Sequence, residues 1–283
     1  MTLKDRTIFI SGASRGVGLA IAQRAARDGA NVALIAKTAE PHPKLEGTIY
    51  TAAEQIDTAG GSALPIVGDI RDEAAVESAV AQAAQRFGGI DIVINNASAI
   101  NLASTEQIEV SRFDLMHQIN VRGSFVVTKA CVPHLRRGTN PHILTLSPPI
   151  SFDPKWLGGN IAYTVAKYGM SMLALGWAEE FRDAGIASNA LWPRTLIATA
   201  AVQNVIGGDA AMRQSRRPEI YADAAYEILT RTSRDCTGNT FLCEDVLMET
   251  GITDFSQYSF IPGADLTADM YVDQINPPQL ADS

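Results

Sequence analysis

The sequence of 283 residues predicts an α/β fold with a doubly wound, mostly parallel sheet of seven strands and helices on both faces. Three observations carry this prediction. Short runs of apolar and β-branched residues alternate with alanine-rich runs of helical spacing, almost from end to end. The strand-like runs are continuously apolar, as expected for strands that are covered on both faces. The loops between them are short, which favours right-handed crossovers between parallel strands.

The elements follow one another in the order that this fold requires. The first strand is expected at residues 7–11, and a helix with apolar residues at helical spacing follows at residues 17–28. The other strands are expected at residues 31–36, 63–67, 90–95, 142–147, 186–191 and 240–248. The other helices are expected at residues 48–59, 73–87, 111–137, 161–183 and 218–230.

Two segments interrupt the alternation. Residues 37–47 contain two prolines and are expected to form a long loop. Residues 251–283 contain Pro262, Pro277 and Pro278 and are expected to form an irregular tail packed on the same domain. We therefore expect one domain in residues 1–250, which lies within the size range of single α/β domains.

Composition and charge exclude several classes of partner. Acidic residues outnumber basic ones, 31 to 23, and the net charge of −8 disfavours nucleic acid and anionic membranes as partners. The three cysteines and four histidines have no metal-ligand spacing, so no metal site is expected. No apolar stretch reaches about 18 residues and no signal peptide is evident, which predicts a cytoplasmic protein without membrane insertion.

A glycine-rich turn follows the first strand. Gly12, Gly16 and Gly18 lie directly before the first helix. Glycines at this place allow a tight turn and let the backbone approach a pyrophosphate, which then meets the helix N–H groups. The spacing is GxxxGxG instead of the commoner GxGxxG. Because the motif ends the first strand of a β–α–β unit, it predicts a dinucleotide site in a Rossmann-type fold.

The end of the second strand indicates which dinucleotide binds. A site for NAD usually has Asp or Glu there to hold the ribose 2′-hydroxyl. Here the strand ends in Ala36 and Lys37, and Arg15 lies in the glycine turn. Two cations near the ribose suit a 2′-phosphate, so NADP(H) is the predicted cofactor. His42 and Lys44 in the next loop would add positive charge.

Polar residues also end the third and fourth strands. Asp69 is placed either to accept a hydrogen bond from the adenine amino group or to cap the next helix, a role that Asp72 could fill instead. Asn95, Asn96 and Ala97 end the fourth strand, where side-chain amides tie strands together or line the cofactor cleft.

Tyr163 and Lys167 form the candidate catalytic pair. Their i,i+4 spacing places both side chains on one face of the predicted helix at residues 161–183. A tyrosine with an ordinary pKa of about 10 is a poor acid or base at neutral pH. A neighbouring ammonium is expected to lower that pKa toward the working range.

Together these motifs resemble those of a classical short-chain dehydrogenase/reductase. The resemblance rests on GASRGVG at 12–18, NNA at 95–97, Asn120, YTVAK at 163–167 and NALWP at 189–193. AKTAEPHPKL at 36–45, LSPP at 146–149 and LWPRT at 191–195 are similar to the hydroxysteroid dehydrogenase-like group. Larger members of that group carry a C-terminal sterol-carrier-like domain, which is not expected in this chain.

The resemblance implies a role for each motif. Tyr163 would donate a proton in carbonyl reduction, and Lys167 would hold the nicotinamide ribose and lower the pKa of Tyr163. Asn120 would kink its helix and hold a water that links Lys167 to solvent. Hydride would pass directly between nicotinamide and a carbonyl or secondary alcohol. The implied cofactor-binding residues are Gly12, Ser14, Arg15, Gly16, Val17, Gly18, Lys37, Asp69, Ile70, Asn96, Ala97, Tyr163, Lys167, Pro193 and Thr195, with Thr199 as the alternative to Thr195.

The sequence departs from the family pattern at its usual serine. That serine lies about thirteen residues before the tyrosine, which here is Ile150, or at Pro148 when counted from the end of the fifth strand. Ser147 is our choice for the carbonyl-polarising hydroxyl because it ends the strand that leads to the cleft, and Ser151 is the alternative. Loss of such a donor costs about 3–4 kcal/mol of transition-state stabilisation.

Two further departures concern the substrate side. Arg194 stands where the family has glycine, either facing an anionic substrate group near the nicotinamide or facing solvent. The last strand runs into Glu244 and Asp245 instead of Asp-Gly-Gly.

The substrate prediction is a lipophilic carbonyl or hydroxyl compound, steroid-like or fatty-acyl-like. The residues expected to line its cleft are Trp156, Leu157, Trp192, Met212 and Tyr163. The alternative is an NADP-binding scaffold or redox sensor with little turnover. The family resemblance also implies a homo-oligomer, a dimer or tetramer formed through the helices at residues 111–137 and 161–183.

Overall fold

Seven strands form one sheet in which every neighbouring pair is parallel, in the order β3-β2-β1-β4-β5-β6-β7. The computed structural model describes residues 1–42 and 45–277. The strands are β1 (Thr7–Ser11), β2 (Asn31–Ala36), β3 (Ser62–Val67), β4 (Ile92–Asn95), β5 (His142–Thr145), β6 (Ala187–Trp192) and β7 (Thr240–Leu242). The chain reverses its direction of travel across the sheet between β3 and β4, as in a Rossmann fold, which confirms the predicted fold class.

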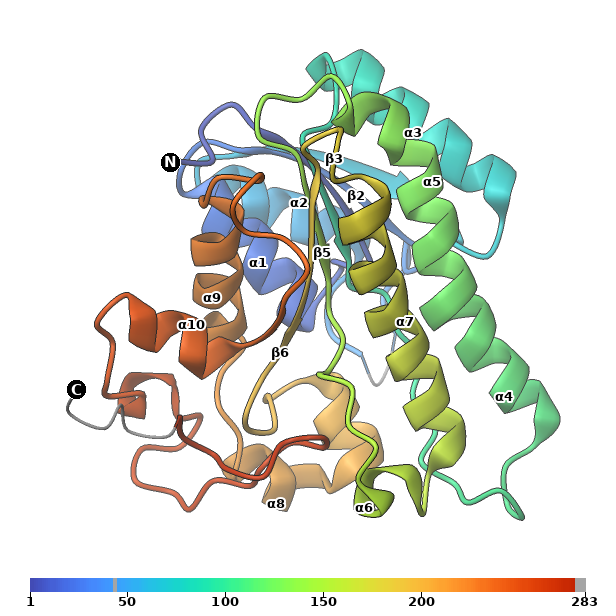
Figure 1. Ribbon diagram of the computed structural model, residues 1–283, viewed down its shortest axis with the longest axis vertical. Helices are drawn as coiled ribbons and strands as arrows, with labels where there is room; N and C mark the ends of the chain where they lie inside the picture. Colours follow the sequence, from blue (N-terminus) through green and yellow to red (C-terminus); the bar gives the residue numbers. More distant parts are fainter. Residues whose placement is uncertain (43–44, 278–283) are drawn as a thin grey trace.

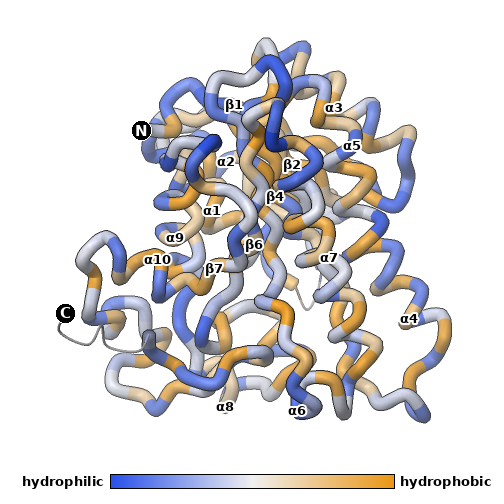
Figure 2. Tube along the Cα trace, in the orientation of Figure 1, coloured by the Kyte–Doolittle hydropathy of each residue, from blue (hydrophilic) through white to orange (hydrophobic). Residues whose placement is uncertain are grey.

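Helices cover both faces of this sheet (Figure 1). One face carries α1 (Gly16–Ala26), α2 (Ile49–Thr58), α9 (Glu219–Leu229) and α10 (Cys243–Glu249), which share one hydrophobic cluster with the strands. The other face carries α3 (Glu73–Phe87), α5 (Ser124–Leu135) and α7 (Ile161–Glu180), which share a second cluster. Hydrophobic and hydrophilic stretches alternate along these helices, as expected where one side of a helix packs on a sheet (Figure 2).

The long helix expected at residues 111–137 has three parts. It consists of α4 (Val110–Met116), the π-helical segment η1 (His117–Gly123) and α5, which follows without a break. The wider π turn contains Asn120, whose side-chain amide bonds the backbone of Ala99 outside the helix. Single π turns of this kind occur often at functional sites.

The strand expected at residues 240–248 is wrong beyond Leu242. Glu244 and Asp245 lie in the first turn of α10, where the helix dipole favours acidic residues. Cys243, Val246 and Leu247 then face the hydrophobic cluster at helical spacing. A contact between distant parts of the chain favours the helix over the expected strand, because Glu244 forms an ion pair with Arg216.

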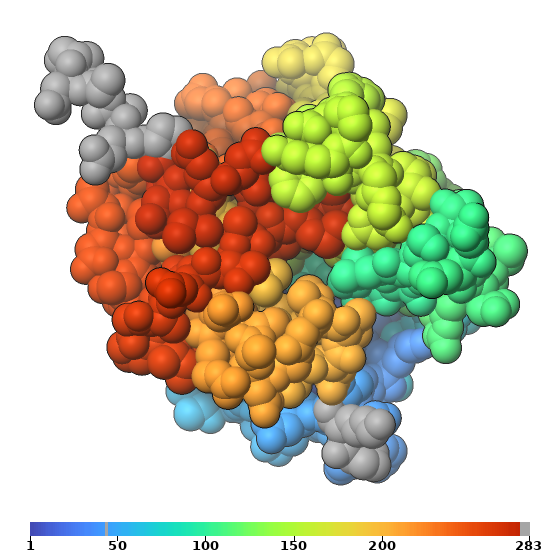
Figure 3. Space-filling model, turned by 90° about the horizontal axis from the view of Figure 1, so that it is seen from below, coloured from blue at the N-terminus to red at the C-terminus, as the bar shows by residue number. Residues whose placement is uncertain are grey.

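The C-terminal segment lies across the carboxyl ends of the strands. Its described part, residues 251–277, contains one short 3₁₀ turn, η3 (Ser256–Tyr258), and otherwise irregular chain. Single β-bridges join Ser259 to Arg216 and Ala268 to Thr195. Seen from below, this segment lies beside α8 (Gly208–Arg213) and α6 (Pro154–Leu157) (Figure 3). Within the described residues, no helix is long and apolar enough to span a membrane.

Candidate active site

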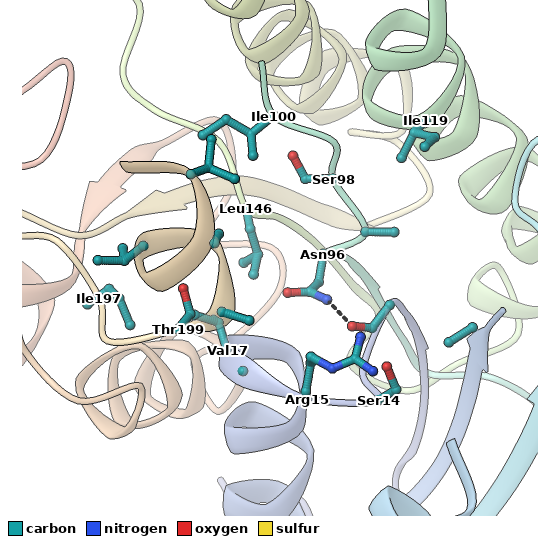
Figure 4. A pocket seen from close by; sticks show the side chains of 18 of the residues that line it. Ser14, Arg15, Val17, Asn96, Ser98, Ile100, Ile119, Leu146, Ile197 and Thr199 are labelled. Carbon is teal, nitrogen blue, oxygen red and sulfur yellow. Dashed lines mark hydrogen bonds between the residues drawn. The ribbon is translucent and has the colours of Figure 1, made fainter. Parts of the chain in front are cut away.

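A cavity of about 610 Å³ opens at the carboxyl ends of the strands, next to the point where the strand order reverses. Ligands of doubly wound sheets bind at this place. Chain segments from the glycine turn, the ends of β2 and β4, α7 and the tail line it. Figure 4 shows the part of this wall that contains Ser14, Arg15 and Asn96. Thirteen of the residues predicted to bind the cofactor contribute to its wall: Gly12, Ser14, Arg15, Gly16, Val17, Lys37, Asp69, Ile70, Asn96, Ala97, Tyr163, Lys167 and Pro193.

The glycine turn is shaped by its close neighbours. Gly12 and Gly16 have φ angles of +74° and +60°, which favour glycine. A Cβ at Gly12 would lie 2.9 Å from the Cα of Ala97. Asn96 Nδ2 donates to the carbonyl oxygens of Ser11 and Gly12, at 2.8 and 2.9 Å, and so holds the turn in place (Figure 4). Arg15 precedes α1 without a side-chain cap, which leaves the helix N–H groups for an anion.

Gly18 does not line the cavity but supports its floor. A Cβ at Gly18 would lie 2.5 Å from Nδ2 of Asn96, so Gly18→Ala must displace the amide that holds the turn. We expect this variant to lower the free energy of unfolding by about 1–3 kcal/mol and to weaken NADPH binding about tenfold. Urea denaturation and NADPH fluorescence titration measure the two effects.

The matched control is Gly176→Ala in α7, where a Cβ meets no atom within 4 Å. This control should be neutral or slightly stabilising, since alanine favours the helix. Equal stability and equal NADPH binding in the two variants would contradict the role assigned to Asn96.

The charged groups near the end of β2 form a network. Lys37 Nζ lies 3.5 Å from Asp69 Oδ2, and Arg71 Nη2 lies 2.6 Å from the same oxygen. Hydrogen bonds from Arg71 hold the pKa of Asp69 at about 2, so this carboxylate is ionised at neutral pH. Arg15 donates to the carbonyl oxygens of Glu46 and Gly47. Three cations against one carboxylate leave an excess of positive charge here.

Arg71 was missed in the sequence because it lies two residues beyond Asp69 in a turn with no recognisable motif. Asp72 caps the N-terminus of α3 by accepting a hydrogen bond from the N–H of Ala75, so Asp69 does not have this role. Lys44, a possible further cation, lies outside the described residues.

Tyr163 and Lys167 are both buried in the cavity wall on α7. Lys167 Nζ donates to the carbonyl oxygen of Leu146 at 2.9 Å and lies 5.2 Å from the ring centroid of Trp192. Burial lowers the pKa of Lys167 to about 8. Burial also raises the pKa of Tyr163 well above its ordinary value, and the charge of Asp269 adds to this rise. The expected lowering of the Tyr163 pKa by Lys167 is therefore wrong for the protein without cofactor.

Asn120 lies behind the cavity wall instead of in it. Its Oδ1 accepts from the N–H of Ala99 at 2.7 Å, and its Nδ2 donates to the Ala99 carbonyl oxygen at 3.0 Å. The backbone carbonyl of Asn120 accepts from the hydroxyl of Ser124. Asn120 thus ties the π segment to the chain that follows β4.

Comparison with known proteins adds independent information to this geometry. The profile of the short chain dehydrogenase family matches residues 6–207. This chain belongs to the short-chain dehydrogenase family. It is 55% identical over 267 residues to the hydroxysteroid dehydrogenase-like protein 2 of Danio rerio, a match that covers 94% of this chain and 64% of that protein. The chain spans less than two thirds of the length of the curated relatives it matches, including those of Xenopus laevis and Rattus norvegicus.

Solved structures agree in fold. The crystal structure of a short chain dehydrogenase from Mycobacterium thermoresistibile is 63% identical, with a TM-score of 0.93, and the match covers 98% of this chain and 99% of that one. A dehydrogenase from Xanthomonas campestris is 53% identical, with a TM-score of 0.93, over 97% and 100% of the two chains. The resemblance to the hydroxysteroid dehydrogenase-like group is thus confirmed.

Neither of the two candidates for the serine of the short-chain dehydrogenase family lines the cavity. Ser147 is fully buried, does not line the cavity, and its Oγ has no hydrogen-bond partner among the described residues. Ser151 does not line the cavity either, and its Oγ accepts from the N–H of Asp153. Thr195 is likewise buried with an Oγ1 that lacks a partner in the described part of the chain, whereas Thr199 lines the cavity.

Arg194 faces neither the cavity nor solvent, so both expectations for it are wrong. Its guanidinium donates to both carboxylate oxygens of Asp245 and to the carbonyl oxygen of Gln274. The Arg194 N–H donates to Glu244. This residue therefore anchors α10 and the tail instead of binding a substrate anion.

The apolar part of the cavity differs from the expected set. Trp192 and Tyr163 line it, but Trp156 and Leu157 pack in a cluster with Tyr271, and Met212 packs against Leu196. The apolar lining comes instead from Ile100, Leu146, Ile197, Val202, Val205, Ile206 and Met270. Asp269 and Met270 from the tail also line the cavity, and no motif in the sequence pointed to them.

Proposed function

We propose that this protein is an NADP(H)-dependent oxidoreductase that interconverts a carbonyl and a secondary alcohol on a lipophilic substrate. One observation carries the proposal. Tyr163 and Lys167, one helical turn apart and both buried, line the same cavity as a glycine turn built for a pyrophosphate. This arrangement supports the proposal of an acid–base group next to a dinucleotide site.

The cavity fits a nicotinamide dinucleotide on the features of this chain alone. Gly12 and Gly16 form a turn with positive φ angles that other residues would strain, a Cβ at Gly12 would also clash with Ala97, and uncapped N–H groups begin α1. Arg15 and Lys37 line the cavity near the end of β2, and β2 itself carries no carboxylate that would hold a ribose 2′-hydroxyl. Arg71, outside the cavity wall, pairs with the neighbouring carboxylate of Asp69. This excess of positive charge supports NADP(H) over NAD(H).

Each residue then has a separate task in the reaction. The bound nicotinamide supplies or accepts hydride at the substrate carbon. Tyr163 gives a proton to the substrate oxygen in reduction and takes it back in oxidation. Lys167 would hold the ribose hydroxyls, and its ammonium would favour the phenolate of Tyr163 once it leaves the carbonyl of Leu146. Asn120 would fix the π segment next to this path.

A lipophilic substrate is supported by the wall of the cavity. Residues from β6, from the π-helical segment η2 (Val202–Ile206) and from the tail present mainly aliphatic and aromatic side chains. Burial of apolar substrate surface against them provides binding energy without charge recognition. Oxidation of NADPH in the presence of a panel of aliphatic and cyclic carbonyl compounds tests the activity.

Lys37 provides the test of cofactor preference. We expect Lys37→Ala to weaken NADPH binding about tenfold and to leave NADH binding unchanged, because only NADPH has the 2′-phosphate. Fluorescence titration with both dinucleotides measures the effect. Lys129→Ala is the matched control, since Lys129 is a similarly exposed lysine paired with an acidic residue, Glu73, outside the cavity wall. Equal losses for NADH and NADPH would contradict the assignment.

A second function, an NADP-binding scaffold or redox sensor, is supported by one observation. Neither Ser147 nor Ser151 presents its hydroxyl to the cavity. If that function holds, the protein binds NADPH but oxidises none of it with any carbonyl of the panel, and Tyr163→Phe behaves as the wild type does.

A homo-oligomer is part of the proposal. Large apolar side chains remain exposed on the outer helices at Phe113, Phe125 and Met172. Burial of these side chains against a second copy would stabilise a dimer or tetramer. Light scattering that shows a monomer would refute this part.

A further inference from the structure

Carbonyl reduction needs more than one hydrogen-bond donor at the substrate oxygen. Negative charge develops on this oxygen as hydride adds to the carbon, and donors aimed at it lower the barrier. Tyr163 provides one donor, but the hydroxyls of Ser147 and Ser151 do not reach the cavity. Another group in the wall must therefore fill this place if the proposed function holds.

Asp269 is the acidic group that the tail brings to this end of the cavity. Its N–H donates to the carbonyl oxygen of Arg194 at 3.0 Å, and the Trp192 Nε1 donates to the carbonyl oxygen of Met270 at 2.9 Å. The same indole ring lies under Lys167 Nζ. These bonds place Asp269 in the wall that Tyr163 and Lys167 also form.

The neighbouring tail residues hold this position firmly. Tyr271 has a φ of +70°, a conformation that is rare for residues other than glycine. Its hydroxyl pairs with Thr164 at 3.1 Å, and its ring contacts Trp156, Tyr168 and Trp192. Strained backbone that is fixed by its surroundings often marks a functional site.

One carboxyl oxygen of Asp269 accepts a hydrogen bond from the backbone, and the other is available to a ligand. Oδ1 accepts from the N–H of Met270 at 2.6 Å. Among the described residues, Oδ2 has no hydrogen bond, and no lysine or arginine lies within ion-pair distance of this side chain. A proton on the second oxygen would thus be free to point at a ligand.

The surroundings favour the protonated form of this carboxyl. The groups that act on it are Lys167 and Tyr163 from α7, Tyr221 from α9, Glu244 from α10, and Tyr271 from its own segment. Burial raises the pKa of Asp269 to about 7, and the charge of Lys167 only partly opposes this rise. The guanidinium of Arg194 is turned away to Asp245.

We propose that Asp269, in its protonated form, donates a hydrogen bond to the substrate carbonyl oxygen beside Tyr163 and thereby replaces the missing serine hydroxyl. This inference rests on the proposed function. The carbonyl carbon gains a hydride from the reduced nicotinamide, the π pair moves to the oxygen, and Tyr163 transfers a proton to it. Asp269 keeps its own proton, so the products remain the alcohol and the oxidised nicotinamide.

Two substitutions separate donation from mere structural support. Asp269→Asn keeps an acceptor for the N–H of Met270 and adds a donor that does not titrate, whereas Asp269→Ala has neither group. With 9,10-phenanthrenequinone and NADPH, we expect Asp269→Ala to lower kcat about 100-fold. The activity of the wild type should decline above about pH 7, where Asp269 loses its proton. Asp269→Asn should retain kcat within about tenfold of the wild type and should not show this decline.

A control and a direct measurement complete the experiment. Asp265→Ala, an exposed residue of the same segment that does not line the cavity, should leave kcat unchanged. Difference infrared spectroscopy should detect a protonated carboxyl in the wild type at about pH 6, absent at about pH 8.5 and absent from Asp269→Asn at both values.

The outcomes separate this inference from the proposed function. Turnover by Asp269→Ala equal to that of the wild type, an unchanged pH profile in Asp269→Asn, or the lack of the infrared signal would overturn the role of Asp269 alone. If the wild type oxidises no NADPH with any carbonyl although the infrared signal is present, the proposed function fails and the inference fails with it.

Discussion

Tyr163→Phe is expected to lower kcat for carbonyl reduction by about 10²- to 10⁴-fold, the usual contribution of a positioned proton donor. The substitution removes one hydroxyl from a ring that is 6% exposed and keeps the apolar packing of the ring. NADPH binding and the free energy of unfolding should therefore change little. Stopped-flow or steady-state oxidation of NADPH measures the loss, and fluorescence titration measures binding.

Tyr226→Phe is the matched control for this prediction. Tyr226 donates its hydroxyl to the carboxylate of Asp28, but it lies on α9 and does not line the cavity. Its removal should leave kcat unchanged. A Tyr163→Phe variant that retains the turnover of the wild type would remove Tyr163 from the reaction.

Arg216→Met is expected to lower the free energy of unfolding by about 3–5 kcal/mol, because it leaves the charge of Glu244 buried without its ion-pair partner. Both side chains are almost fully buried, and they form a direct ion pair. Arg216 also donates to Asn276 and to the carbonyl oxygen of Ile275 in the tail. Burial raises the pKa of Glu244, so part of the loss should be recovered when low pH protonates this carboxyl.

The pair Arg231 and Glu249 provides the control for that prediction. Its side chains are 29% and 57% exposed, and Arg231→Met should cost less than about 1 kcal/mol. The double variant Arg216→Met with Glu244→Leu removes both buried charges and should be more stable than Arg216→Met alone. Urea denaturation of all variants decides the matter, and equal losses for Arg216→Met and Arg231→Met would contradict the prediction.

The predictions for Tyr163→Phe and Arg216→Met concern residues that are connected through the tail. The ion pair of Arg216 with Glu244, together with Arg194 and Asp245, fastens α10 and the tail to the chain that follows β6. The tail in turn places Asp269 and Met270 in the cavity wall. We therefore expect a stability change at Arg216 to alter the geometry of the site as well.

Local patterns in the sequence were sufficient to predict the fold and the part of the cavity wall that the glycine turn and α7 form. Continuous apolar runs for buried strands and a period of 3.6 residues for helices are both visible in any one segment. The glycine turn and the pair Tyr163 and Lys167 are equally local, since each lies within a few residues. For this reason the parallel sheet, the glycine cradle and the buried pair agree with the structure.

Contacts between distant segments decided the rest. Arg194 turns to Asp245, Glu244 is buried against Arg216, and Asp269 joins Tyr163 and Lys167 in the cavity wall only because the tail folds back along the end of β6. Such partners leave no periodic signal, because each depends on two segments meeting in space. The sequence by itself determined the Rossmann-type sheet and the pair Tyr163 and Lys167, whereas only the tertiary structure decided which groups surround that pair in the cavity wall, because these groups come from segments distant in the sequence.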